Sequence, residues 1–286
     1  MTLKAVIPAA GLGTRNLPAS KAIPKEMLPI VDVPSIQLIV EEALAAGIRD
    51  IILVTGRGKH AIEDHFDLAY ELEDTLKRRG KTELAERMSR IARMVNLISV
   101  RQKEPLGLGH AVLCAREAAG DSPIAVMLPD DLVDAPRPAV AQLADVFVKT
   151  GKGCIGLMQV EAGQEGKYGI VKGKQAAPRL WQLEDLVEKP EPAKAPSRLA
   201  IVARYVLPPS IFSVLEKTPP GKGGEIQLTD GLLTLARSEG LMGWEFEGTR
   251  YDAGDKLGWL EANLAYAMKR PELAAPLRAY LKKLLQ

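Results

Sequence analysis

The sequence predicts an α/β fold with a doubly wound, mixed but mainly parallel sheet, followed by C-terminal helices. Two apolar segments, residues 3–9 and Asp50–Thr55, flank a helical pattern and so form a strand–helix–strand unit, which favours right-handed parallel pairing. A further segment, residues 123–128, is wholly apolar, as strands covered by helices on both faces are. From residue 153 onward the strand patterns become more amphipathic, which indicates mixed or antiparallel pairing.

The composition describes a globular chain with little net charge. Its 286 residues are 47% hydrophobic, which is ample for a buried core. The 38 Lys and Arg residues nearly balance 36 Asp and Glu residues, giving a net charge of +2, so we expect neither nucleic acid nor a membrane surface as partner. Cys114 and Cys154 show neither metal nor disulfide spacing, and no apolar stretch approaches a membrane span. These features favour a cytoplasmic protein.

The first strand leads into a glycine-rich loop at residues 11–15. Gly11 and Gly13 have no Cβ, so backbone N–H groups there can approach an anion closely. Arg15 and Lys25 add positive charge nearby. The segment therefore predicts a phosphate-binding loop.

Two common nucleotide loops do not fit this segment. A dinucleotide fingerprint needs a helix that opens near Asn16, and Pro18 and Pro24 disfavour one. A Walker A loop needs four residues between its glycines and then Gly-Lys, whereas one residue separates Gly11 from Gly13. An extended loop that ends near Lys25 remains.

The next elements continue the alternation of helices and strands. Pro34 and Gly47 bound a helix, and the strand Asp50–Thr55 follows it. Residues 56–59, Gly-Arg-Gly-Lys, could form a second phosphate loop, but after a buried strand they are more typical of a solvated turn. Residues 60–94 are helical by pattern, with a basic run at residues 77–81 that suits a solvated face or a turn between helices.

The strand Asn96–Arg101 opens into a loop that suits recognition of a nucleotide base. The flat amide of Gln102 offers one acceptor and two donors, and Gly107 and Gly109 allow close backbone approach. His110 is more typical of a helix start than of a catalytic base. Taken alone this motif is a weak signal, but its place after a parallel strand favours a base-binding site.

Asp130 follows the strand at residues 123–128. Ligands of open α/β sheets bind at the carboxyl ends of the strands, and Mg²⁺ prefers carboxylate oxygens together with substrate phosphates. Asp130 is therefore a candidate metal ligand, with a turn cap as the alternative. For the neighbouring Asp131 the cap is the better interpretation.

The second half predicts a smaller set of strands. They cover residues 153–160, 168–172, 179–187 and 199–206, with a turn at 173–178 and a loop at 190–196. Residues 256–286 predict two amphipathic helices that divide near Arg270 and Pro271. Glu188 and Lys189 are adjacent, so a strand would direct them to opposite faces, and they share a pocket only at a strand end or a bulge.

The glycine loop and the string Ala-Ile-Pro-Lys-Glu-Met-Leu-Pro at residues 22–29 resemble the sugar-phosphate nucleotidyltransferases, and within them the bacterial enzymes that use UTP and glucose 1-phosphate. Residues 102–110, 168–171, 187–190, 221–230 and 251–256 match later motifs in the family's order. The resemblance implies a Rossmann-like nucleotidyltransferase fold in one domain, residues 1–286. Within it we expect a nucleotide-binding lobe (1–150), a smaller sugar-binding lobe (151–255) and a C-terminal helical tail (256–286).

The resemblance also implies the site residues. Arg15 and Lys25 are the expected catalytic residues. Nucleotide-binding positions are Ala10, Gly11, Gly13, Thr14, Glu26, Gln102, Gly107 and Gly109, with the uracil at the Gln102 loop. Sugar-phosphate-binding positions are Gly169, Glu188 and Lys189, and the Mg²⁺ ligands are Asp130 and Asp252.

The implied reaction joins UTP and glucose 1-phosphate into UDP-glucose and pyrophosphate, with Mg²⁺, in a homo-oligomer of two or four chains. Ala203 stands where the family has glycine, so its added methyl group puts the preferred sugar in question. Three alternatives stay open: a preference for dTTP, another sugar 1-phosphate, or a regulatory relative without catalysis. A regulatory relative without catalysis is disfavoured because the charged residues expected at the site are all present, namely Arg15, Lys25, Asp130, Lys189 and Asp252.

Overall fold

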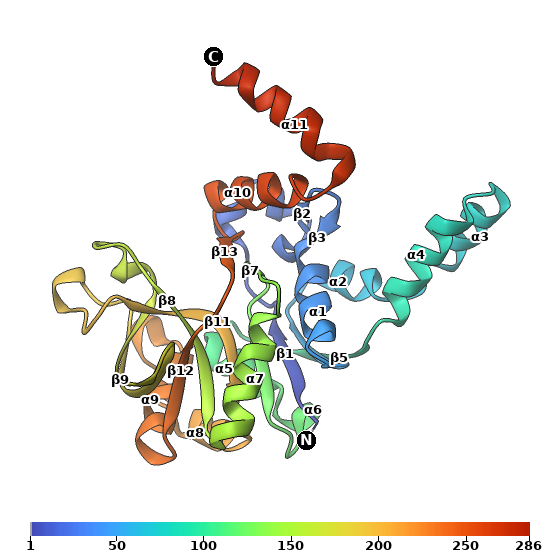
Figure 1. Cartoon of the computed structure of the whole chain (residues 1–286). Coiled ribbons are helices and arrows are strands. Elements are labelled where there is room, and N and C mark those ends of the chain that lie inside the picture. The colour runs from blue at the N-terminus through green and yellow to red at the C-terminus, as the bar shows by residue number, and fades with distance from the viewer. Residues whose placement is uncertain (1) are drawn as a thin grey trace.

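The structure, a computed structural model, describes residues 2–286, apart from the Lys222 side chain, and is built around one large sheet (Figure 1). Within that range the sheet has nine strands. In sheet order they are β5 (Asn96–Arg101), β4 (Asp50–Thr55), β1 (Lys4–Pro8), β6 (Ile124–Met127), β11 (Leu199–Leu207), β8 (Gly153–Gln159), β12 (Leu241–Glu245), β10 (Leu180–Glu188) and β9 (Gly169–Ala177).

The sheet changes character halfway across. Strands β5, β4, β1 and β6 run parallel to one another. Strand β11 then runs antiparallel to both β6 and β8, β12 is parallel to β8, and β10 and β9 are antiparallel. The predicted mixed α/β class is confirmed, with its continuous parallel part in the first half of the chain.

Helices cover both faces of the sheet because its strands are apolar on both sides. In β1, Ala5 and Ile7 face a core completed by α1 (Ser35–Ala45) and α7 (Ala139–Thr150). Val6 points the opposite way, into a core completed by α5 (Leu108–Cys114), α8 (Ser210–Lys217) and α9 (Leu228–Ser238). Burial on both faces explains the continuous apolar run of the first strand.

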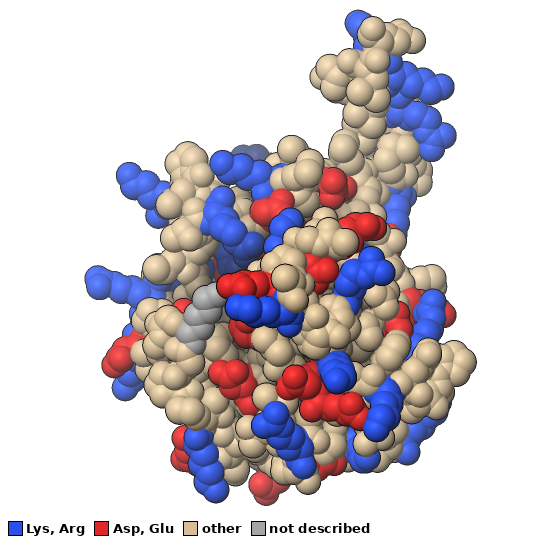
Figure 2. All heavy atoms as spheres, turned by 90° about the vertical axis from the view of Figure 1, so that its left-hand side faces the viewer, with Lys and Arg blue, Asp and Glu red and all other residues tan. Residues whose placement is uncertain are grey.

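The predicted helical region at residues 60–94 contains three helices. They are α2 (His60–His65), α3 (Tyr70–Arg78) and α4 (Thr82–Arg93), and the basic run includes the turn between the last two. Helices α3 and α4 extend from the body as an arm (Figure 1). The C-terminal helices α10 (Lys256–Ala267) and α11 (Pro271–Leu284) divide where expected, and α11 stands away from the body with no buried residue (Figures 1 and 2).

The predicted turn at residues 173–178 is wrong. Strand β9 continues through Gly173 to Ala177, and the actual turn consists of Pro178 and Arg179, the latter with φ 64°. The register with β10 shifts beside Gly173, and a Cβ there would lie 2.5 Å from the Gln182 carbonyl oxygen. This glycine permits a close approach inside the strand, where the sequence suggested a turn.

Two small ladders lie outside the large sheet, and the second of them connects distant parts of the chain. Strands β2 (Pro29–Ile30) and β3 (Val33–Pro34) form one, and β7 (Asp131–Asp134) pairs antiparallel with β13 (Thr249–Asp252) in the other. The second places Asp131 opposite Asp252 and brings the late acidic turn to the end of β6. Helix α6 (Arg116–Ala119) completes the α-helices of the described chain.

One sheet runs through both predicted lobes, and the lobe boundaries at 150 and 255 stay predictions. None of the helices in residues 2–286 combines the length and apolarity needed to cross a bilayer. On the face seen in Figure 2, basic and acidic side chains are interspersed, in keeping with the small net charge.

Candidate active site

Two adjoining hollows lie at the carboxyl ends of β1, β5 and β6. The glycine-loop hollow, about 530 Å³, is lined by residues 10–15, Lys25, Gln102, Gly107 and Glu225 among others. The Glu188 hollow, about 510 Å³, is lined by Gly169, Glu188, Lys189, Thr229 and Asp252 among others. Both hollows include Arg15, Leu108, Leu128 and Asp130, so those residues mark where they meet.

The glycine loop has no α-helix after it, as its prolines predict. Three short 3₁₀ turns follow instead, at Thr14–Asn16, Ala19–Lys21 and Lys25–Met27. Gly13 has φ 67°, and its carbonyl accepts a 2.7 Å hydrogen bond from Ser20 Oγ. The loop therefore folds back over Lys25, which a Cβ at Gly13 would approach within 3.1 Å.

Lys25 and Arg15 converge on Asp130. Lys25 Nζ donates to Asp130 Oδ2 at 2.7 Å, and Arg15 Nη2 lies 3.5 Å from the same oxygen. Burial alone would raise the pKa of Asp130, but the positive charges of Lys25 and Arg15 outweigh burial and lower this pKa. Burial alone would lower the pKa of the Lys25 amine, but the negative charges of Asp130 and Glu26 outweigh burial and raise it. Both groups are therefore charged at neutral pH.

Gln102 is oriented by two internal partners. Its Nε2 donates to the Gly107 carbonyl at 3.1 Å and lies 3.0 Å from His110 Nδ1. The sequence indicated His110 as a helix-start residue, and it lies in the first turn of α5. With both amide hydrogens engaged, Gln102 Oε1 is left without a partner among the described residues and can accept from a ligand N–H.

Two predicted nucleotide-binding residues do not line the hollow. Gly109 packs against the next segment, where its N–H donates to the Ile226 carbonyl at 2.8 Å, and a Cβ would lie 2.7 Å from that oxygen. Glu26 is only 1% exposed, and its Oε2 accepts from Lys59 Nζ at 2.8 Å. Both residues therefore make contacts inside the protein, next to residues that line the hollow.

Glu188 and Lys189 share the second hollow because β10 ends between them. Glu188 is the last residue of the strand, and Lys189 has φ 45°, which departs from the alternating pattern. The expected strand end is confirmed. Thr229 Oγ1 donates to Glu188 Oε2 at 2.6 Å, while Lys189 Nζ lies 3.4 Å from Oε1. At Gly169 a Cβ would lie 3.2 Å from Glu188 Oε2, so this glycine leaves room for the carboxylate.

Asp252 is held from both sides. Its Oδ1 accepts from the Gly254 N–H at 3.0 Å, and its Oδ2 accepts from Arg250 Nη2 at 3.1 Å. A Cβ on Gly254 would lie 3.0 Å from Asp252 Oδ1 and 3.0 Å from Asp130 Oδ2, so the two carboxylates converge on this glycine. Among the described side chains no group of three or more His, Cys, Asp or Glu residues is arranged to hold a metal ion.

Arg250 is a functional candidate that the sequence analysis missed. It forms ion pairs with Asp131 and Asp252, and Nη1 donates to the Tyr168 hydroxyl at 3.2 Å. Burial opposes its charge, but Asp131 outweighs burial and raises its pKa. Its position two residues before Asp252 was an available signal, because alternate residues of a strand share a face.

Arg204 was also missed. This fully buried arginine forms an ion pair with Glu42 at 2.7 Å and donates to the Asp131 carbonyl at 2.7 Å, which fixes the segment after β6. A lone arginine in the apolar sequence of Leu199–Leu207 indicates such a buried pair.

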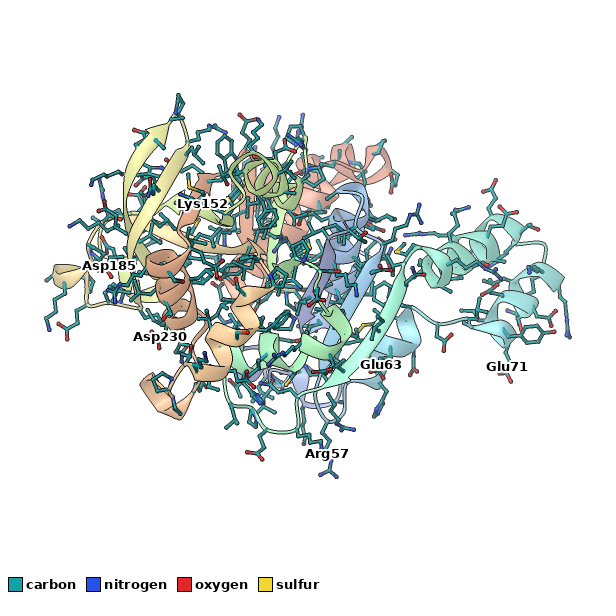
Figure 3. The ribbon with its side chains drawn as sticks, turned by 90° about the horizontal axis from the view of Figure 1, so that it is seen from below. Arg57, Glu63, Glu71, Lys152, Asp185 and Asp230 are labelled. Carbon is teal, nitrogen blue, oxygen red and sulfur yellow. The ribbon has the colours of Figure 1, made fainter. Side chains whose placement is uncertain are left out.

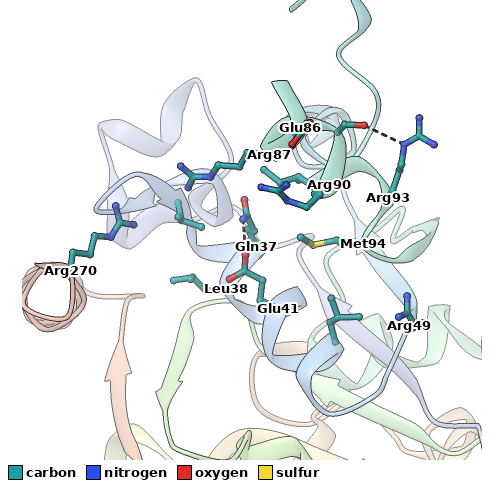
Figure 4. A pocket seen from close by; sticks show the side chains of 14 residues that line it. Gln37, Leu38, Glu41, Arg49, Glu86, Arg87, Arg90, Arg93, Met94 and Arg270 are labelled. Atoms are coloured by element: carbon teal, nitrogen blue, oxygen red, sulfur yellow. Dashed lines mark hydrogen bonds between the residues drawn. The ribbon is translucent and has the colours of Figure 1, made fainter. Parts of the chain in front are cut away.

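A third hollow, about 920 Å³, lies between α1 and α4 and contains none of the predicted residues (Figure 4). Several arginines line it, but Arg87 and Arg270 both pair with Asp32, and Gln37 donates to Glu41 at 2.8 Å. The predicted site residues that line a hollow therefore lie in the two smaller hollows and not in this larger one.

Comparisons with known proteins agree with this geometry. The family model described as Nucleotidyl transferase matches residues 4–269. The UTP–glucose-1-phosphate uridylyltransferase YngB of Bacillus subtilis is 52% identical over 283 residues, which cover 99% of this chain and 95% of that protein. The UDP-glucose pyrophosphorylase from Acinetobacter baumannii superposes with a TM-score of 0.93 at 42% identity, covering 99% of this chain and 100% of that one. A UTP-bound structure of the Acinetobacter baumannii enzyme gives a TM-score of 0.92 at 42% identity, with the same coverage.

Proposed function

This chain belongs to the nucleotidyl transferase family, and from that premise we propose that it is a UTP–glucose-1-phosphate uridylyltransferase. In the proposed reaction the phosphate of glucose 1-phosphate attacks the α-phosphorus of UTP, and pyrophosphate leaves. The observation that carries the proposal is the junction of two hollows at Arg15 and Asp130, with an amide aimed into one and a Glu–Lys pair in the other.

We assign UTP to the glycine-loop hollow. The backbone of residues 10–14 and the charges of Arg15 and Lys25 suit a triphosphate. Gln102 Oε1 suits the N3–H of uracil, because it is the acceptor that Gly107 and His110 leave open. Thymine carries the same N–H, whereas cytosine has an acceptor there, so this contact separates UTP from CTP but not from dTTP.

We assign glucose 1-phosphate to the Glu188 hollow. Glu188 suits sugar hydroxyls, since a carboxylate accepts hydrogen bonds, and Lys189 supplies a counter-charge for the phosphate. Ala203 lines this hollow and is buried, so its methyl group contributes to the shape that selects the sugar.

The chain's task is to align two anions that repel. A phosphate monoester near pH 7 is largely dianionic and needs no protein base to become a nucleophile. Lys189 on one side and Arg15 and Lys25 on the other neutralise charge where the two substrates meet, and Arg15 faces the departing pyrophosphate.

We further propose a divalent cation, Mg²⁺, at Asp130 and Asp252. Two carboxylates that converge beside Gly254 fit an ion that takes its remaining ligands from phosphates and water. When bound, the ion would neutralise the nucleotide phosphates and polarise the α-phosphorus.

We propose a cytoplasmic enzyme that works as a homo-oligomer. Both cysteines are free thiols, which suits a reducing compartment. Helix α11 buries none of its residues against its own chain, and Tyr280 and Leu284 are exposed on it, so a second subunit would give this helix a packing partner.

The test is pyrophosphate release over a matrix of UTP, dTTP, CTP and ATP against several hexose 1-phosphates with Mg²⁺. The proposal expects the highest kcat/KM for UTP with glucose 1-phosphate. A higher value for dTTP would favour a thymidylyltransferase, and no release with any pair would favour a regulatory relative.

A further inference from the structure

The loop after β4, residues 56–59, forms an exposed turn at Arg57 and Gly58, as its sequence suggested, but it ends in a buried lysine. Lys59 is only 7% exposed, and its Nζ donates to Glu26 Oε2 at 2.8 Å. Glu26 is 1% exposed, and its Oε1 has no hydrogen-bond partner among the described residues. A buried carboxylate with one partner depends strongly on that partner.

This ion pair joins the turn that carries Lys25 to the loop after β4, which lies behind the glycine loop. A Cβ on Gly56 would lie 3.1 Å from the Ala10 carbonyl oxygen, so the Lys59 loop packs directly on the start of the glycine loop. The Glu26 carbonyl accepts from Ser35 Oγ at 3.0 Å, which anchors the turn to α1. Lys59 therefore connects the end of β4 to the turn that carries Lys25.

The charges around Glu26 give the pair a second role. Burial raises the pKa of Glu26, and Lys59 and then Lys25 oppose that rise. Lys25 is next to Glu26 in the chain and its amine donates to Asp130 at 2.7 Å; burial lowers the pKa of this amine, but the negative charges of Asp130 and Glu26 outweigh burial and raise it. If Lys59 were absent, Lys25 would be the cation left to neutralise Glu26, and its flexible amine would be drawn away from Asp130.

We propose that Lys59 is a positioning residue for the uridylyl transfer, which acts through Glu26. It lines neither hollow, so it does not touch the substrates. By neutralising Glu26 it leaves the Lys25 charge to Asp130 and the nucleotide phosphates, and it fixes the Lys25–Met27 turn against the glycine loop. This inference rests on the proposed function.

The test compares Lys59→Met, Glu26→Gln and the double variant, with Arg57→Met as control. Arg57 lies in the same loop but is exposed and directed away from the body (Figure 3). Lys59→Met should lower kcat about 10- to 100-fold, as a catalytic group displaced by about 1 Å does, and leave the KM for glucose 1-phosphate within about twofold. Adding Glu26→Gln should restore at least half of that loss on a logarithmic scale, because no buried charge then competes for Lys25. Arg57→Met should match the parent.

Three results would overturn the assignment: Lys59→Met with the parent's kcat, a folded double variant no more active than Lys59→Met, or a double variant that does not fold. If Lys59→Met itself is insoluble, the double variant decides, since the proposal requires it to fold and to keep kcat within about tenfold of the parent. The parent enzyme is assayed in parallel, which separates the proposed function from the role of Lys59. An inactive parent would contradict the proposed function and not the role of Lys59.

Discussion

Lys25 Nζ and Asp130 Oδ2 are joined by a 2.7 Å hydrogen bond, which couples a proposed catalytic cation to a proposed metal ligand. The pair keeps both groups charged and close to where they act, which is how a preorganised site limits reorganisation during reaction.

Replacing Asp130 or Asp252 by Asn should lower turnover by about 100-fold or more, because each change removes a charge that positions the metal. Thermal denaturation should show a folded protein for both, since the amide keeps most of the side chain's size. Turnover near that of the parent at limiting Mg²⁺ would remove the altered residue from the metal site.

Removing the metal should abolish turnover without unfolding the chain. Asp130 is paired with Lys25 and Asp252 with Arg250, so neither carboxylate is left uncompensated when the ion is absent. Dialysis against EDTA should therefore stop pyrophosphate release, leave the melting temperature within about 2 °C of the untreated protein, and be reversed by added Mg²⁺. Full activity after exhaustive chelation would contradict a metal requirement.

Gln102→Ala should weaken UTP binding more than pyrophosphate binding, because the lost contact is to the base. The preference for UTP over CTP should fall by about 1–3 kcal/mol, while the ratio of UTP to dTTP should change little. Competition assays with the three nucleotides measure both ratios. An unchanged UTP-to-CTP ratio would place base recognition elsewhere in the hollow.

Arg15→Lys should impair the enzyme although the charge is kept. A compact ammonium cannot reproduce the planar fork that grips two phosphate oxygens, and the loss should appear in kcat as charge develops on pyrophosphate. Steady-state kinetics with varied UTP separates kcat from KM. A lysine variant that turns over at the parent's rate would reduce Arg15 to a steering charge.

Much of this arrangement could be predicted because it depends on local signals. The apolar strands, the prolines that exclude a helix after Gly13, and the break at Pro271 are each readable within a few residues, and the structure has all of them. Asp130 and Gln102 were indicated because each follows a strand of the parallel part of the sheet, where position in sequence fixes position at the edge of the sheet.

The missed features depend on contacts between distant segments. Lys59 looks like a solvated lysine until its loop meets Glu26, which is 33 residues away. Thr229 falls in the segment 221–230 that matches a family motif, but its partner becomes visible only in the structure, where α9 brings it to Glu188. Glu26 shows the converse case, since a motif predicts it at the nucleotide site while the structure buries its carboxylate against Lys59.

Lys189→Ala should raise the apparent KM for glucose 1-phosphate about 10- to 100-fold and leave the KM for UTP nearly unchanged, because a charge-assisted hydrogen bond to phosphate is lost. Glu188→Gln should instead weaken selection among hexose 1-phosphates, since it alters a hydroxyl partner that Thr229 orients. Initial rates with each substrate varied separately decide the matter. If Glu188 and Lys189 were only a surface ion pair, neither substitution would change substrate binding or sugar selection by more than about 0.5 kcal/mol.

In the proposed reaction a sugar phosphate in the Glu188 hollow attacks the α-phosphorus of UTP in the glycine-loop hollow. Phosphorus NMR of a reaction with glucose 1-phosphate whose phosphate oxygens carry heavy oxygen tests this step directly. UDP-glucose should then contain all of the label, including the oxygen that bridges the two phosphorus atoms, and the pyrophosphate should be unlabelled. Label in the pyrophosphate, or no UDP-glucose in the presence of Mg²⁺, would contradict it.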